Sequence, residues 1–159
     1  MQEVELSESE GFRLRKAGIW DIDELEELER RSFTFGRFSK SILLGFLRHP
    51  FCTTIVIERD SIVASAIVLF HTQGTEIASI AVIPEERRKG YAGRLLEEAE
   101  NISRRRGILS LSLHVAVEND AATSLYAKYG YNISERVRDY YGAGRDAYYM
   151  VKKLDDPDA

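Results

Sequence analysis

The sequence predicts a mixed α/β domain built around one central sheet, and three observations lead to that fold class. Short β-rich apolar runs alternate with amphipathic stretches of helical period along most of the chain. The length of 159 residues suits a single domain, and a hydrophobic content of 44% can fill an ordinary core. We therefore expect one folded unit over residues 11–154, between a flexible acidic tail over residues 1–10 and a short flexible tail over residues 155–159.

The chain is expected to enter the fold through an edge strand and a first helix. Phe12–Ala17 alternates apolar and basic residues, as an edge strand does. Asp21 and Glu24 have the spacing of a capping box, which predicts that a helix starts there. The apolar face of this helix would be formed by Ile22, Leu25 and Leu28.

A second helix and a hairpin should follow. Ser39 is expected to cap a helix over Ile42–Leu47. Thr53–Ile57 and Ile62–Phe70 have the composition of two strands, joined by a turn at Arg59-Asp60.

The second half of the chain is predicted to alternate strands and helices and to end in two strands. The expected strands are Ile77–Ile83, Leu109–Val117, Asn132–Arg138 and Ala147–Lys153. The expected helices are Ala92–Arg106 and Ala121–Lys128. The resulting order, β-α-α-β-β-β-α-β-α-β-β, is that of a mixed α/β fold.

The most informative segment is the charged turn between the strand that ends at Ile83 and the next helix. It carries Arg87-Arg88-Lys89 and two glycines, Gly90 and Gly93. The first N–H groups of a helix lack internal partners, and the helix dipole favours negative charge there. Because glycine lets the backbone approach a phosphate closely, the segment predicts a site for a diphosphate-bearing cofactor. Its spacing fits neither the Walker pattern nor the dinucleotide fingerprint.

Two motifs carry a family resemblance. Arg87-x-x-Gly90-x-Ala92 is similar to the pyrophosphate loop of the GNAT acetyltransferases, which bind acetyl-CoA. Asn119–Tyr131 resembles the signature Asn-x-x-Ala-x-x-Leu-Tyr-x-x-x-Gly-Phe/Tyr of the same family. The resemblance extends from Phe12 to Lys153. It implies a GNAT fold, with a mixed and mostly antiparallel sheet of about seven strands flanked by four helices.

The resemblance also implies which residues contact acetyl-CoA. Backbone N–H groups near Val82, on a strand that bulges in the family, would face the thioester carbonyl. Asn119 would contact the pantetheine arm or hold the strand-to-helix turn, and an N-cap role is compatible with this. The expected contacts are Ile80, Ala81, Val82, Arg87, Arg88, Lys89, Gly90, Tyr91, Ala92, Gly93, Asn119 and Tyr126. No metal is expected.

Three side chains are candidates for acid–base chemistry. His114 lies mid-strand, where RimI-type enzymes carry glutamate and some related N-terminal acetyltransferases carry histidine; a neutral imidazole can accept the amine proton. Glu76 is a second candidate base, directly or through water. Tyr126 matches the family tyrosine that can donate a proton to the cofactor sulfur. The alternatives are a strand histidine with a satisfied hydrogen bond and a tyrosine that packs on the sheet.

The C-terminal segment indicates which kind of molecule accepts the acetyl group. Residues 138–150 resemble the hairpin of RimI- and Ard-type protein N-terminal acetyltransferases, whose paired tyrosines, here Tyr140 and Tyr141, line the cleft for a peptide N-terminus. Arg145 stands where that family usually has glutamate. The aromatic loop over Phe33–Phe38 is expected to form the opposite wall.

Either Phe35 or Phe38 of that loop would contact the first substrate side chain. Free α-amino groups have a pKa of about 7.7–8.0, so a fair fraction is neutral near pH 7, whereas a lysine amine at about 10.4 needs far stronger deprotonation. These features favour direct acetyl transfer from acetyl-CoA to a protein or peptide N-terminus in a ternary complex. A GNAT enzyme for a small amine and a catalytically silent acyl-CoA-binding module remain alternatives.

Composition limits the other function classes. A net charge of −4 argues against a nucleic-acid partner, and the chain has no apolar run of about 18 residues that could span a membrane. The single cysteine, Cys52, precedes an apolar strand and is interpreted as a small buried hydrophobe. The first ten residues do not resemble a signal peptide, so a cytoplasmic protein is expected. Association with a ribosome or an auxiliary subunit is left open.

Overall fold

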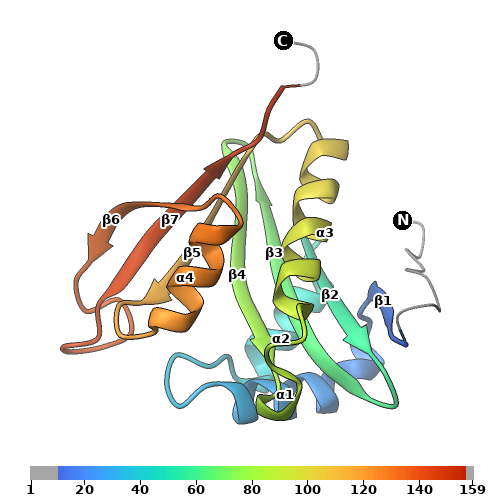
Figure 1. The fold of residues 1–159 in the computed structure, drawn as a ribbon. Coiled ribbons are helices and arrows are strands. Elements are labelled where there is room, and N and C mark those ends of the chain that lie inside the picture. The colour runs from blue at the N-terminus through green and yellow to red at the C-terminus, as the bar shows by residue number, and fades with distance from the viewer. Residues whose placement is uncertain (1–10, 157–159) are drawn as a thin grey trace.

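The computed structural model describes residues 11–156, which form a central sheet flanked by helices (Figure 1). The strands are β1 Arg13–Lys16, β2 Cys52–Glu58, β3 Ile62–His71, β4 Gly74–Val82, β5 Ser110–Ala116, β6 Asn132–Val137 and β7 Ala147–Lys153. The helices are α1 Ile22–Ser32, α2 Lys40–Arg48, α3 Tyr91–Arg105 and α4 Asp120–Lys128, with short 3-10 helices at η2 Ile19–Asp21 and η3 Pro84–Glu86. This confirms the expected order of strands and α-helices. The predicted tails at residues 1–10 and 157–159 lie outside the described residues.

The sheet has seven strands in the order β1-β2-β3-β4-β5-β7-β6. All neighbouring strands are antiparallel except β4 and β5, which run parallel. A parallel pair needs a crossover connection, and α3 supplies it (Figure 1). The mixed and mostly antiparallel sheet implied by the family resemblance is therefore confirmed.

The core lies on both faces of the strands around β3. All residues of Cys52–Ile57 and Ile62–Val68 are buried, as expected for strands covered on both sides. In Figure 1, α3 crosses in front of these strands and α2 lies behind them. β5 differs, because its residues alternate between buried and partly exposed. His114 belongs to the partly exposed set, so the fold leaves one face of β5 available for a site.

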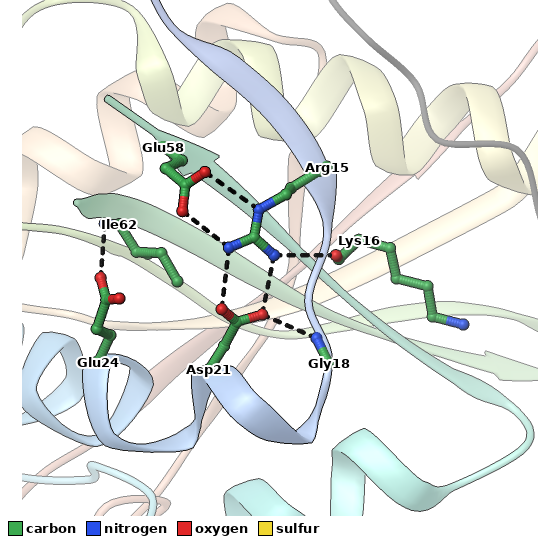
Figure 2. A network of polar contacts seen from close by, with 7 residues as sticks. All are labelled: Arg15, Lys16, Gly18, Asp21, Glu24, Glu58 and Ile62. Atoms are coloured by element: carbon green, nitrogen blue, oxygen red, sulfur yellow. Dashed lines mark hydrogen bonds and ion pairs between the residues drawn. The ribbon is translucent and has the colours of Figure 1, made fainter. Parts of the chain in front are cut away.

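Arg15 joins the first strand to the first helix (Figure 2). Its guanidinium donates to both carboxylate oxygens of Asp21 at 2.9 Å, and to Glu58 of β2 at 2.9 Å. Burial acts to raise the pKa of Asp21, but hydrogen bonds from Arg15 and from the Gly18 N–H hold it below its ordinary value. The bidentate pair fixes the angle at which the chain leaves β1 and enters α1.

The predicted capping box at the start of α1 is wrong. Asp21 occupies the N-cap position but makes no side-chain cap bond, because its carboxylate is engaged by Arg15. Glu24 instead accepts the N–H of Ile62 at 2.9 Å, which ties α1 to the start of β3 (Figure 2). The predicted cap of α2 is confirmed, since the Ser39 hydroxyl accepts a hydrogen bond from the N–H of Ile42, the third residue of the helix.

Some element boundaries differ from those predicted. β4 begins at Gly74 rather than Ile77, because its first residues pair with the end of β3 in a tight hairpin. Cys52 lies inside β2, where burial raises the pKa of its thiol to about 11; its interpretation as a buried hydrophobe is confirmed. Among residues 11–156, no helix combines the length and apolar character needed to cross a membrane.

Candidate active site

β4 and β5 form a ladder over only three residue pairs and then separate. The ladder runs from Thr75 opposite Leu111 to Ile77 opposite Leu113. Beyond it the two parallel strands diverge, as Figure 1 shows. A pocket of about 310 Å³ lies at this point. It is lined by Gly36, Phe38, Glu76, Ile77, Ala78, His114, Tyr140 and Tyr141.

The pocket lining contains most of the residues predicted to act on the acceptor. His114 and Glu76, the two candidate bases, come from β5 and β4. Phe38 comes from the loop after α1, and Tyr140 and Tyr141 from the loop between β6 and β7. Segments about a hundred residues apart in the sequence thus meet at one site.

His114 contacts two tyrosine rings. Its imidazole stacks on Tyr140 with ring centroids 4.1 Å apart and an interplanar angle of 6°. The ring of Tyr149, the partner of His114 across β5 and β7, is tilted by 40° to the imidazole, with centroids 5.0 Å apart. Burial lowers the pKa of His114 below its ordinary value, while the carboxylates of Glu76 and Glu135 act in the opposite direction. The imidazole is therefore neutral at pH 7 and can accept a proton.

Glu76 places a negative charge in the same pocket. One carboxylate oxygen lies 3.2 Å from Nε2 of His71, within hydrogen-bond distance. Burial raises the pKa of Tyr140, and the charge of Glu76 adds to that effect. Glu76 therefore influences the charge state of both rings of the stacked pair.

Two loops meet at the mouth of the pocket. The Phe35 ring packs edge-on against Tyr141 with centroids 5.5 Å apart, and Tyr140 packs edge-on against Tyr141 at 4.8 Å. Gly36 approaches the Tyr141 ring so closely that a Cβ there would lie 2.8 Å from it. Of the two predicted phenylalanines, Phe38 lines the pocket and packs on Phe46 of α2, whereas Phe35 lies outside the lining.

A bulge in β4 brings its backbone to the pocket. The register with β3 shifts between Ser79 and Ile77, so that Ala78 has no opposite partner in the ladder. The family resemblance placed the bulged region near Val82, and the structure places the bulge earlier in the strand. Ile80 and Val82 are partly exposed beyond it, and Ala81 points into the core.

Glu29 is a buried carboxylate that the sequence analysis did not single out. It is 2% exposed, and its two oxygens accept the N–H of Phe38 and the hydroxyl of Ser79, each at 3.0 Å. Burial raises its pKa, and these two bonds act against the rise. Glu29 thereby connects α1 to one wall of the pocket and to the bulge in β4. The sequence contains one signal for this role: Glu29 follows Leu25 by four residues, which places an acid on the apolar face of the helix.

The turn between β4 and α3 has backbone geometry suited to an anion. Arg88 and Gly90 have positive φ angles of 64° and 84°. The first helical bond runs from the Arg94 N–H to the carbonyl of Gly90, so the N–H groups of residues 91–93 have no partner inside the helix. Space is open around Gly90, since nothing lies within 4 Å of a Cβ built there.

Two basic side chains of this turn have structural partners instead of pointing freely outwards. Arg87 donates to the carbonyls of Val82 at 3.1 Å and Ser32 at 3.3 Å. Lys89 pairs with Glu86 at 2.8 Å. These contacts hold the turn in shape, and the fit of the turn to an anion therefore rests on its unpaired backbone N–H groups more than on these two side chains.

The chain is similar to known proteins over most of its length. The model of the acetyltransferase (GNAT) family matches residues 21–131. The chain belongs to this family. A Bacillus subtilis protein provisionally named [ribosomal protein bS18]-alanine N-acetyltransferase is 30% identical over 139 residues, covering 86% of this chain and 92% of the relative.

Two further comparisons agree with this GNAT assignment. A [ribosomal protein bS18]-alanine N-acetyltransferase of Haemophilus ducreyi is 31% identical over 121 residues, covering 76% of this chain and 83% of the relative. The crystal structure of Ard1 from Thermoplasma volcanium has a TM-score of 0.84 at 23% identity, covering 92% of this chain and 99% of that chain, which shows the same fold. The resemblance read from the two motifs is confirmed.

The second GNAT motif forms α4 and its flanking residues. Asn119 caps the helix, because its side-chain oxygen accepts the N–H of Ala122 at 3.1 Å. Tyr126 lies in the last turn of α4 and packs edge-on against Tyr131, with ring centroids 6.3 Å apart. Burial raises the pKa of Tyr126 well above its ordinary value, so the phenol stays protonated at neutral pH. A protonated phenol is the form that a proton donor requires.

GNAT acetyltransferases use acetyl-CoA, and the turn before α3 fits its diphosphate. The fit rests on the left-handed residues, the unpaired helix N–H groups and the open space at Gly90. Gly93 has a different role, since a Cβ there would lie 1.9 Å from the hydroxyl oxygen of Tyr129. Its small size lets the start of α3 approach the end of α4.

Proposed function

We propose that this GNAT enzyme transfers the acetyl group of acetyl-CoA to the N-terminal α-amine of a protein or peptide. The observation that carries the proposal is the placement of His114, stacked on Tyr140, in the pocket where β4 and β5 diverge. A candidate base, an acidic side chain and two tyrosines of the hairpin all face one space. The names of the two bacterial relatives, each specifying an alanine of a ribosomal protein, support the same acceptor class.

In the proposed reaction the acceptor nitrogen attacks the thioester carbonyl directly. His114 takes the proton from the amine, and Tyr126 returns a proton to the departing thiolate as the carbon–sulfur bond breaks. Backbone N–H groups of β4 after the bulge at Ala78 stabilise the charge on the carbonyl oxygen. The turn over residues 87–93 and the segment Ile80–Val82 hold the cosubstrate, with Asn119 fixing the approach of α4.

The choice of an α-amine follows from the strength of the base. Burial lowers the pKa of His114, which keeps the imidazole neutral but makes it a weak base. A base of this kind suits an α-amino group with a pKa of about 7.7–8.0 and not a lysine amine at about 10.4.

We also propose that the domain spans residues 11–154 and acts in the cytoplasm, with or without an auxiliary subunit.

The deciding experiment measures CoA release from acetyl-CoA with a panel of short peptides. The panel varies the first residue and includes lysine peptides with a blocked N-terminus and a few small amines. We expect turnover only with free peptide N-termini. Turnover confined to small amines would show that the acceptor is a small molecule and not a peptide. The absence of turnover, together with thermal stabilisation by acetyl-CoA, would identify a silent binding module.

A further inference from the structure

The mouth of the pocket carries a positive charge that no step above uses. The guanidinium carbon of Arg145 lies 4.0 Å above the centre of the Phe35 ring. Phe35 contacts Tyr141, and Tyr141 lines the pocket. The guanidinium is therefore connected to the pocket lining through the rings of Phe35 and Tyr141.

The backbone around Arg145 is fixed by the turn that carries it. Its N–H donates to the carbonyl of Gly142 at 2.9 Å, and its carbonyl accepts the N–H of Tyr141 at 3.0 Å. Backbone hydrogen bonds thus join Arg145 to Gly142 and to Tyr141, which lines the pocket. The Arg145 side chain is exposed, and its guanidinium lies over the Phe35 ring.

The acidic residues of this loop are engaged within the loop itself. Asp139 accepts the N–H of Gly144 at 2.7 Å, and Asp146 accepts the N–H of Asp139 at 3.0 Å and pairs with Arg136 at 2.9 Å. For Arg145, the partner seen within residues 11–156 is an aromatic face and not a carboxylate. A guanidinium stacked on a ring keeps its N–H donors available at the ring edge for a planar anion.

The interior of the pocket has the opposite charge. Glu76 lines it, and both Glu76 and Glu135 act electrostatically on His114. An ammonium entering the pocket therefore meets negative charge, and the segment that remains at the mouth meets positive charge. This polarity suits an acceptor with its amine at one end and an anionic group a short distance behind.

We propose that Arg145 selects peptides with Asp or Glu at the second to fourth position, behind the acetylated first residue. The inference rests on the proposed function and names its substrate class more narrowly. An extended peptide advances about 3.3 Å per residue, so the side chains that follow the first residue pass the pocket mouth in turn. A carboxylate there can pair with the guanidinium above Phe35.

The test compares peptides that share a first residue and carry Asp, Asn or Lys at the second, third and fourth positions. With the wild-type protein at low ionic strength, the best acidic peptide should exceed its Asn counterpart in kcat/KM by about two- to fivefold, the range for a solvent-accessible ion pair. The advantage should shrink at high salt. Arg145→Gln should abolish the preference, and Arg145→Glu should reverse it in favour of Lys.

Arg106→Gln is the matched control. In the wild type, the guanidinium carbon of Arg106 also lies 4.0 Å above an aromatic ring, that of Phe70. Arg106 directly follows the C-terminal end of α3, at the top of Figure 1, whereas both pocket loops lie at the lower edge of the sheet. This variant should keep the wild-type preference, and all variants should keep the KM for acetyl-CoA. Equal turnover of acidic and neutral peptides, or a preference that survives Arg145→Gln, would overturn the inference while leaving the proposed function intact. Turnover of no peptide would overturn both. Acetylation of a small amino acid in place of peptides would also overturn the inference, since Arg145 would then bind the free carboxylate of that amino acid.

Discussion

The imidazole of His114 and the phenol ring of Tyr140 lie parallel, with centroids 4.1 Å apart and planes within 6° of each other. The candidate base sits on β5, whereas its stacking partner belongs to the loop between β6 and β7 that also forms the acceptor wall. The stacked ring shields one face of the imidazole from water, and burial is the largest influence on the pKa of His114. Acceptor recognition and proton transfer are therefore coupled through one ring contact.

The first prediction separates His114 from Glu76 as the base. The Glu76 carboxylate raises the pKa of His114, against the larger lowering by burial. In Glu76→Gln the pKa of His114 should fall further, so the acidic limb of kcat/KM should move to lower pH. NMR titration of the His114 ring should show the same displacement.

A matched control and a contrary outcome sharpen this prediction. His71→Asn removes the hydrogen-bond partner of Glu76 but keeps the carboxylate, so the acidic limb should stay closer to that of the wild type. A loss of about 10²–10⁴ in kcat at every pH for Glu76→Gln would instead assign the base to Glu76. His114→Gln would then leave most of the rate.

The second prediction concerns Tyr126 as proton donor. Tyr126→Phe should lower kcat by about 10²–10⁴ with little change in the KM for acetyl-CoA, because the lost hydroxyl acts only as the thiolate leaves. Since burial raises the pKa of Tyr126, its ionisation should not limit the rate at mildly alkaline pH. Steady-state kinetics across pH measures both effects.

Tyr131→Phe provides the control for Tyr126→Phe. The Tyr131 ring contacts Tyr126, and its hydroxyl is buried without a hydrogen-bond partner among the described residues. Removing an unsatisfied buried hydroxyl should leave kcat unchanged and stability equal or higher. If both variants lost activity equally, the effect would belong to packing around α4 and not to proton donation.

Local signals were the part of this fold that the sequence could predict. The caps at Ser39 and Asn119 each depend on a span of a few residues, and the structure contains both. The two signature motifs are also local, since each spans a few residues, and they predict the diphosphate turn and α4. Their family resemblance also brought His114 and Tyr140 into one hypothesis, although no local rule predicts that their rings stack.

Contacts between distant segments were what the sequence could not predict. Asp21 has the spacing of a cap, but Arg15 engages its carboxylate, and Arg15 is also bound by Glu58, which is 43 residues away from it. The bulge at Ala78 depends on the register that β4 adopts against β3, which a single strand does not specify. The position of Glu29 on the apolar face of α1 can be read from the sequence, but its hydrogen bonds from Ser79 and Phe38 cannot.

The third prediction concerns the contact between α3 and α4. A Cβ at Gly93 would lie 1.9 Å from the hydroxyl oxygen and 2.4 Å from Cζ of Tyr129, so the ring or the helix start must move. Gly93→Ala should destabilise the fold by about 1–3 kcal/mol and raise the KM for acetyl-CoA, because the diphosphate turn shifts with α3. Chemical denaturation and initial-rate kinetics measure the two effects.

Gly45→Ala is the opposite case on another helix. Gly45 lies inside α2, and nothing lies within 4 Å of a Cβ built there. This change should stabilise the fold by about 0.5–1 kcal/mol through helix propensity alone and leave the KM for acetyl-CoA unchanged. Equal effects of the two substitutions would show that the approach of Tyr129 to Gly93 does not constrain the helix.

The last prediction concerns Glu29 and the pH dependence of stability. Burial raises its pKa in the folded state above the ordinary value of 4.5, so folding favours the protonated form. The stability that this contributes is present below the unfolded-state pKa and is lost as pH rises through the folded-state pKa. Relative to Glu29→Gln, the wild type should therefore lose stability as pH rises above the ordinary value of 4.5 and through the raised folded-state pKa, which thermal melts at successive pH values can follow.

Glu29→Ala distinguishes the hydrogen bonds of this residue from its charge. Glutamine can still accept the N–H of Phe38 and donate to the Ser79 hydroxyl, whereas alanine leaves the partly buried Phe38 N–H without its acceptor. Alanine should cost about 1–3 kcal/mol at every pH and should loosen the wall at Phe38, raising the KM for the acceptor more than the KM for acetyl-CoA. Equal stability of the alanine and glutamine variants would mean that water replaces Glu29, and that the bulge in β4 keeps its shape without this carboxylate.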